Sequence, residues 1–169
     1  KDEYAASQYL TKFSRLIRLI LDHSHQEFIS IHSEKELLGH YLEMESLRFD
    51  QHFTYDIVIS QGVNEEWQIP SMVIQPHVEN AIWHGLLHKK GECHVVIRFE
   101  TENQNSLRIT IEDNGIGRAR AQELRSKQIL KKKSYGSTLS AERIKKTYRM
   151  HEHPASLTIT DLHDGDGHP

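Results

Sequence analysis

The sequence predicts an α+β fold preceded by one long helix. Apolar residues recur at three- and four-residue spacing over about the first 27 residues, which is the pattern of an amphipathic helix. Alternation of apolar and polar residues predicts three strands, at 53–59, 94–99 and 106–112. Further helical patterns are found at 33–49, after Pro70, and at 137–149. Because strands and helices are interspersed, we expect them to share one domain.

Length and composition limit the class of protein. A chain of 169 residues has room for one good-sized domain plus an appendage. No apolar run approaches the ~20 residues that span a membrane. The single cysteine, Cys93, excludes a disulfide framework within the chain and fits a reducing cytoplasm. There is no initiator methionine or signal peptide, and the helical pattern begins at Lys1, so we expect a piece of a longer protein.

The net charge of −3 is unevenly distributed. Residues 118–133 include seven basic residues and one acidic residue, a local charge of +6 in an otherwise acidic chain. This distribution favours a local anionic ligand over duplex DNA, which requires a broad basic face. No aromatic residue interrupts the basic stretch, so we expect a mobile, solvated lid and no direct binding of nucleic acid.

The first helix needs a partner for its apolar stripe, which consists of Tyr9, Leu10, Phe13, Leu16, Ile17, Ile20 and Leu21. The stripe could pack on the domain that follows or on a second copy of itself. It is narrow, as in a helix bundle, because it is flanked by the charged residues Lys12, Arg15, Arg18 and Asp22. We therefore favour a dimer.

A short strand at 28–31 and a second helix are predicted next. The Ser-Glu-Lys-Glu sequence at 33–36 is a capping box that contributes ~1 kcal/mol and starts a helix to about Phe49. The buried face of this helix should consist of Leu37, Leu38, Tyr41, Leu42 and Leu47.

Two prolines precede the central part of the chain. Pro70 is predicted to open a helix, and Pro76 should kink it or mark its true start, since proline lacks a backbone N–H. The strands 94–99 and 106–112 are joined by a turn-prone segment and should form an antiparallel hairpin. A last strand is expected at 157–160, and turn residues at 164–167 have no strand after them.

Two motifs suggest a binding site. Residues 75–85 place His77, Asn80 and His84 at helical spacing on one face of an apolar helix. Alone, this face could be a satisfied polar seam between a helix and a sheet. However, the sequence Asp-Asn-Gly-Ile-Gly at 113–117 follows about thirty residues later, directly after a predicted strand. The two motifs in this order favour a site over a seam.

These motifs, the basic segment and the Ser-Tyr-Gly sequence at 134–136 resemble the Bergerat (GHKL) ATP-binding fold of gyrase, Hsp-type chaperones, MutL and histidine kinases. Within that group, residues 41–49 and 69–81 resemble the LytS-like sensor histidine kinases. The resemblance implies a two-layer sandwich at 28–169, with a mixed, mostly antiparallel sheet packed on helices and the last strand missing. Residues 1–27 would be the second helix of a dimerisation and phosphoacceptor hairpin.

The resemblance also implies an activity. The parent protein would transfer the γ-phosphoryl group of ATP to a histidine and then to an aspartate of a response regulator, often one with a LytTR domain. It would be a homodimer anchored in the inner membrane of a bacterium, and this chain would belong to its cytoplasmic portion. The acceptor histidine would lie upstream in a Pro-His-Phe context, leaving no catalytic residue here and no autophosphorylation by this chain alone.

The resemblance implies an ATP site made of His77, Asn80, His84, Asp113, Gly115, Gly117, Lys131, Lys132, Lys133 and Gly136. Asn80 would offer a carbonyl oxygen to Mg²⁺, which prefers oxygen ligands. Asp113 would accept a hydrogen bond from the adenine amino group, although it could instead be a turn aspartate. Gly115 and Gly117 would let the backbone approach the base and ribose, and Gly136 would bring backbone amides to the phosphates.

Departures from the family pattern leave alternatives open. Pro76 replaces the glutamate base of ATP-hydrolysing relatives, which argues against an ATP-hydrolysing switch. Trp83 replaces a frequent lysine and only one glycine, Gly136, marks the last phosphate motif, so a non-catalytic nucleotide-binding or docking module is the rival interpretation. A zinc site at His84 and His88 is disfavoured, because no glutamate stands between them.

Overall fold

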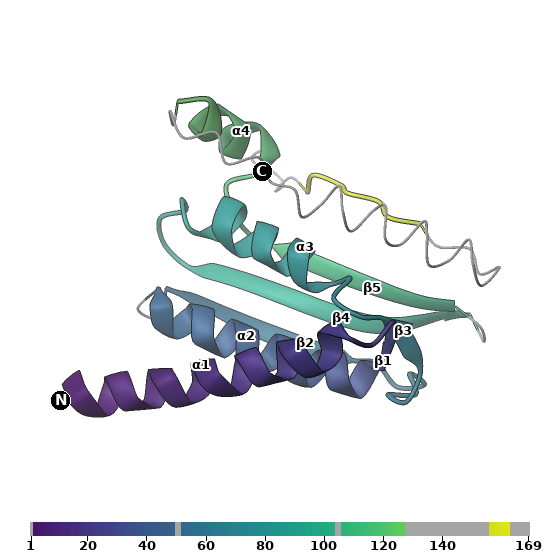
Figure 1. Cartoon of the computed structure of the whole chain (residues 1–169). Coiled ribbons are helices and arrows are strands. Elements are labelled where there is room, and N and C mark those ends of the chain that lie inside the picture. The colour runs from purple at the N-terminus through teal and green to yellow at the C-terminus, as the bar shows by residue number, and fades with distance from the viewer. Residues whose placement is uncertain (1, 50–51, 104–105, 128–155, 163–169) are drawn as a thin grey trace. The chain divides into compact units, whose positions relative to one another are not determined.

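The computed structural model describes residues 2–49, 52–103, 106–127 and 156–162 (Figure 1). In chain order its elements are α1 (Asp2–Ser24), β1 (Phe28–Ser30), α2 (Ile31–Arg48), β2 (Phe53–Ile59), β3 (Gln68–Pro70), α3 (Gln75–Asn80), the π-helix η1 (Ala81–Leu86), β4 (Cys93–Asn103), β5 (Ser106–Asp113) and α4 (Arg118–Lys127). Helices and two sheets share the chain, which confirms the predicted α+β class.

The chain divides into two compact units. The first unit contains Lys1–Met72 and Val96–Thr110, and the second contains Val73–Val95 and Ile111–Pro169. Strands β4 and β5 each continue from one unit into the other. The two motifs singled out above both belong to the second unit.

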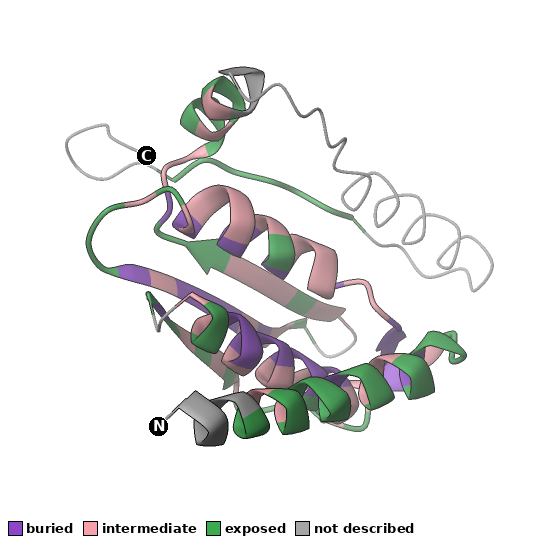
Figure 2. Ribbon diagram, turned by 60° about the vertical axis from the view of Figure 1, so that its left-hand side comes forward, coloured by how far each residue is buried: buried purple, intermediate pink, exposed green. Residues whose placement is uncertain are grey.

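In the first unit, α1 packs along α2 (Figure 1). Leu16 is buried, and ion pairs join Lys12 to Glu43 and Arg15 to Glu36. The opposite side of α1 is green along much of its length in Figure 2, and it presents four large apolar residues that are 39–61% exposed, Leu10, Phe13, Ile17 and Leu21. The helix therefore covers α2 with one side and offers an apolar stripe on another.

Helix α2 begins three residues earlier than predicted. Ser30, in extended conformation, is the N-cap, and its Oγ accepts a hydrogen bond of 3.1 Å from the Ser33 N–H. The predicted capping residue Ser33 lies inside the first turn, so the predicted start was wrong. The buried positions Leu37, Leu38, Tyr41 and Leu42 are confirmed. Leu47, however, is exposed, because it lies on the opposite side of the last turn.

The strands form two sheets. Strands β1 and β3 pair antiparallel, with the buried Ile29 opposite Ile69. Strand β3 was not predicted, and it contains Pro70, so the prediction that Pro70 opens a helix was wrong. The other sheet has the order β2-β4-β5, and β2 has the predicted bounds. Neighbouring strands separated by only two residues, such as β4 and β5, must run antiparallel, because a parallel connection needs a dozen or more.

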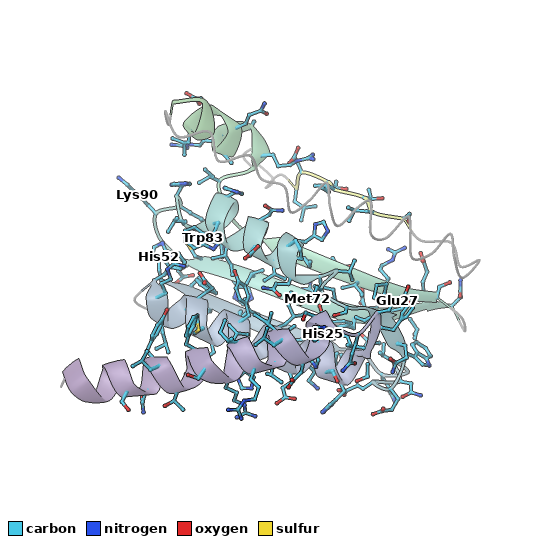
Figure 3. All side chains as sticks on the ribbon, viewed as in Figure 1. His25, Glu27, His52, Met72, Trp83 and Lys90 are labelled. Carbon is cyan, nitrogen blue, oxygen red and sulfur yellow. The ribbon has the colours of Figure 1, made fainter. Side chains whose placement is uncertain are left out.

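Hydrogen bonds join the segment before β1 to the residue after β3, at one end of the small sheet. Ser71 Oγ donates to the carbonyl of His23 at 2.9 Å, and the Ser71 N–H donates to the carbonyl of Glu27 at 3.0 Å. Met72, which is labelled in Figure 3, follows with φ of 60°, a left-handed conformation that is uncommon for residues other than glycine. The second unit begins at the next residue, Val73.

Two C-terminal predictions have different outcomes. Residues 156–162 are described without strand structure, so the strand predicted at 157–160 is not found. The helix predicted at 137–149 lies outside the described residues. Helix α4, by contrast, was not predicted, because its polar sequence shows no apolar periodicity.

Candidate functional site

The first motif of the second unit lies on α3 and η1. Pro76 is in the first turn of α3, where its missing N–H leaves no helical bond unmade, which confirms that it marks the true start of the helix. After Asn80 the helix widens into the π form, as the bond from the Leu87 N–H to the Ile82 carbonyl shows. His77 and Asn80 therefore share an α-helical face, while His84 lies on the π turn. Such π turns are frequent at functional sites.

The π turn and the second motif are interlocked through two glycines. A Cβ on Gly85 would come within 3.0 Å of the Asp113 Oδ1 atom, and a Cβ on Gly115 would come within 3.0 Å of the backbone of Gly85. The Gly85 carbonyl also accepts a hydrogen bond of 3.2 Å from the Ile116 N–H. The chain thus brings an acidic side chain against bare backbone, an arrangement that no other pair of residue types would permit.

Asp113 carries the main electrostatic feature of this site. Desolvation raises the pKa of its carboxyl group, although part of the residue is open to solvent. The Gly115 N–H, which donates to Oδ1 at 2.9 Å, and the charge of Lys89 both lower the pKa, while Glu112 raises it. Only one carboxylate oxygen is used by Gly115, so Oδ2 can accept a hydrogen bond from a ligand.

Asn80 and His77 differ in what surrounds them. Asn80 is half-buried, and its side chain makes none of the hydrogen bonds recorded among the described residues. Its amide oxygen therefore fits the role of a single protein ligand to a nucleotide-borne Mg²⁺. Burial lowers the pKa of His77, whose buried Nε2 has no hydrogen-bond partner in the described part of the chain. A fully satisfied polar seam, the alternative interpretation of this face, does not describe His77.

The remaining predicted site residues are only partly placed. Gly117 has φ of 74°, a left-handed conformation that favours glycine, and it leads into α4. Arg118 is held by Asp161 through two hydrogen bonds of 2.6 and 2.7 Å. The four positions Lys131, Lys132, Lys133 and Gly136 lie outside the described residues.

Sequence reasoning missed two residues that the structure brings to Asp113, Gly85 and Lys89. Gly85 ends the first motif, and its position after His84 was the available signal. Lys89 lies close enough to influence Asp113, but nothing in the sequence of the Lys89-Lys90 loop indicates this. Glu79 precedes Asn80 directly, and desolvation raises its pKa. Trp83, the departure from the family pattern noted in the sequence, lies on η1 (Figure 3).

Within the described ranges, the structure contains neither a metal-binding cluster nor a helix able to span a membrane. No three or more His, Cys, Asp or Glu side chains there are grouped so that they could hold a metal ion, including those around His84 and His88. None of the helices in the same ranges is both long and apolar enough for a membrane span.

Comparisons with known proteins point to one kind of signalling protein. A family model described as "Histidine kinase" matches residues 1–53. The chain is 34% identical over 114 residues to the sensor histidine kinase BtsS and 37% identical over 112 residues to the sensor histidine kinase YpdA, both of Escherichia coli K12. It is 30% identical over 116 residues to the sensor protein LytS of Oceanobacillus iheyensis. These matches cover 66–69% of this chain but only 19–20% of each relative.

Proposed function

Because the chain belongs to the LytS-like sensor histidine kinases, we propose that its second unit binds Mg-ATP for a protein-histidine kinase. The observation that carries this proposal is the interlock of Gly85, Asp113 and Gly115, which leaves a carboxylate beside bare backbone. This geometry suits a flat, nitrogen-rich ring, because a base can approach the backbone closely while its amino group donates to Oδ2 of Asp113. We also propose that the α+β fold of this chain is of the Bergerat type.

The electrostatics of Asp113 suit such a role. A carboxylate that is partly desolvated makes a stronger hydrogen bond to a donor than a fully hydrated one. The Gly115 N–H and the positive charge of Lys89 favour its ionised form, which is the form that accepts. Asp113 would therefore identify the base by its exocyclic amino group.

Asn80 would hold the metal that accompanies the nucleotide. Bound Mg²⁺ supplies charge neutralisation for the phosphate oxygens and orients them for transfer. Within this chain, Asn80 contributes one neutral oxygen on α3, and the basic residues from Arg118 to Lys133 would contribute positive charge near the phosphates. His77, which burial keeps neutral, would add a hydrogen-bonding group on the same helical face as Asn80.

The whole-protein reaction follows from the family. We propose γ-phosphoryl transfer to a histidine outside this chain and then to the aspartate of a response regulator, of LytTR type. None of the 13 histidines here stands in a Pro-His-Phe context. The exposed stripe on α1 would bind the same helix of a second copy, which gives the dimer that such transfer uses. A docking module without kinase activity would bind nucleotide but support no transfer in the full-length protein.

Calorimetric titration of this chain with ATP, in the presence and absence of Mg²⁺, tests the proposed function directly. We expect saturable binding of one ATP per chain that tightens with Mg²⁺. An absence of binding at millimolar ATP under both conditions would refute the proposal.

The Asn80→Ala variant is expected to distinguish binding of the metal from binding of the base. It should weaken Mg-ATP binding by roughly ten- to a hundredfold, the loss typical when groups that support a bound metal are removed. Binding of metal-free ATP and of adenosine should change little, because neither needs the amide oxygen. Asn64→Ala, which removes a surface asparagine of the first unit, is the matched control. Equal losses for all three ligands would show that Asn80 is structural.

A further inference from the structure

Asn114 uses all of its hydrogen-bonding groups on one segment of the second unit. Its backbone N–H donates to the His94 carbonyl at 3.2 Å, and its side-chain Oδ1 accepts from the His94 N–H at 2.8 Å. Its Nδ2 donates to the Glu92 carbonyl at 3.2 Å, and its own carbonyl accepts from Nζ of Lys89. Four bonds at one residue of a short loop indicate a fixed position.

The two bonds to His94 reproduce the pattern of a strand ladder. In an antiparallel pair, two opposite residues exchange both backbone bonds. Here the side-chain oxygen of Asn114 takes the place of a backbone carbonyl, just after β5 ends at Asp113 and beside the start of β4. The backbone carbonyl of Asn114 is thereby released to Lys89. Asparagine therefore ends the pairing without leaving the His94 groups unbonded.

The loop that follows is anchored at a second point. The Ile116 N–H donates to the Gly85 carbonyl at 3.2 Å, and Gly115 packs on the backbone of Gly85. Asp113 is thus followed by one anchor to the segment 89–94 and another to η1. A carboxylate next to two anchors keeps its direction, which is what recognition of a base requires.

We propose that Asn114 is a positioning residue that sets the direction of the Asp113 carboxylate, an inference that rests on the proposed adenine site. Asn114 does not touch the nucleotide. Its hydrogen bonds determine the position of the neighbouring Asp113 carboxylate. They thereby determine how well the site distinguishes a base with an amino group from one without. Lys89 supports the same arrangement through the Asn114 carbonyl.

Few other residues could replace Asn114. Aspartate would keep the acceptor for the His94 N–H but would set a second carboxylate oxygen against the Glu92 carbonyl. Serine offers only one short hydroxyl, and alanine offers neither a donor nor an acceptor. Alanine is therefore the variant that removes the positioning with the smallest additional perturbation.

The test compares ATP with purine riboside triphosphate, which lacks the exocyclic amino group. Asn114→Ala should weaken ATP binding about tenfold, the loss of one well-placed hydrogen bond. It should change the affinity for purine riboside triphosphate by no more than about twofold. In an Asp113→Ala background, Asn114→Ala should cause no further loss of ATP affinity, because the group that it positions is gone. Asn64→Ala, whose side chain bonds the Glu66 N–H in the first unit, should change neither ligand.

A second measurement needs no nucleotide. In Asn114→Ala, amide exchange at Ile116 should accelerate about tenfold or more, and the NMR-measured pKa of Asp113 should move toward that of an ordinary aspartate as water reaches it. Unchanged exchange and pKa, or an equal loss for both triphosphates, would overturn the positioning role. If the unmodified chain bound neither triphosphate while the pKa and exchange still changed, the proposed function would fail and the positioning of Asp113 would stand.

Discussion

Replacing Gly85 with alanine is expected to remove nucleotide binding while leaving the fold largely in place. The new methyl group would occupy the space of Oδ1 of Asp113, which is the end of a short, rotatable side chain. Asp113 can avoid the methyl group by turning away, so the strain is relieved at the expense of its bond to Gly115 and its direction. We expect ATP affinity to fall at least a hundredfold, the sum of a lost base contact and a partly filled site.

Gly115→Ala is expected to act differently, although it lies in the same interlock. Its methyl group would meet backbone atoms of Gly85, which cannot rotate away. One of the two chain segments must then shift, at a cost typical of overpacking, about 1–3 kcal/mol of unfolding free energy. The pair separates two effects: Gly85→Ala should lower affinity with little change in stability, and Gly115→Ala should lower both.

Isothermal titration and thermal unfolding of the two variants check this expectation. Gly39→Ala is the control, because nothing lies within 4 Å of a Cβ there and Gly39 is within α2 of the first unit. Alanine in a helix interior should raise stability slightly and leave affinity unchanged. Full ATP affinity in Gly85→Ala would exclude this part of η1 from the site.

The parts of the fold that could be predicted from sequence are those determined by local pattern. Strand β2 has the predicted bounds because its alternation of β-forming residues is continuous. The buried residues of α2 follow from helical spacing in the same way. The start of α2 was misplaced because Ser30 and Ser33 are both good caps, and only the extended backbone of Ser30 distinguishes them.

The parts that could not be predicted depend on partners distant in the chain. Strand β3 has three residues and exists through its pairing with β1. The π turn of η1 is accompanied by contacts between Gly85 and residues 113–116, about thirty positions later. Sequence spacing could indicate Asn80 and Asp113 as candidate site residues, but it could not show that Gly85 lies against Asp113 or that Asn114 is bonded to His94.

Replacing Asp113 with asparagine should weaken ATP binding and raise stability together. Asparagine keeps the shape of aspartate, and its Oδ1 can still accept from the Gly115 N–H at the present position. The group at the Oδ2 position becomes an NH₂ donor facing the adenine amino donor. An unpaired donor on each side costs ~1–3 kcal/mol, so we expect a ten- to a hundredfold loss of affinity.

The stability change has a definite dependence on pH. Desolvation raises the pKa of Asp113 in the folded protein, so the folded state holds this proton more tightly than the unfolded chain does. The resulting stabilisation is fully present below the pKa of an ordinary aspartate and is lost as the pH rises through the folded pKa. At neutral pH the ionised carboxylate is therefore a cost, which asparagine removes. The gain from Asp113→Asn should appear at neutral pH and vanish under acidic conditions.

Chemical unfolding at neutral and acidic pH, together with ATP titration, measures both effects. Glu112→Gln is the matched control, since it removes a neighbouring carboxylate of the same strand that only influences Asp113 through its charge. It should leave ATP affinity within about threefold, a change smaller than the loss of one hydrogen bond. A carboxylate kept at the expense of stability is expected where function requires it, because binding sites retain unfavourable groups that a purely structural turn would not. If Asp113→Asn destabilised the chain at neutral pH and left ATP affinity unchanged, Asp113 would be the turn aspartate of the alternative interpretation, and the base site would have to lie elsewhere.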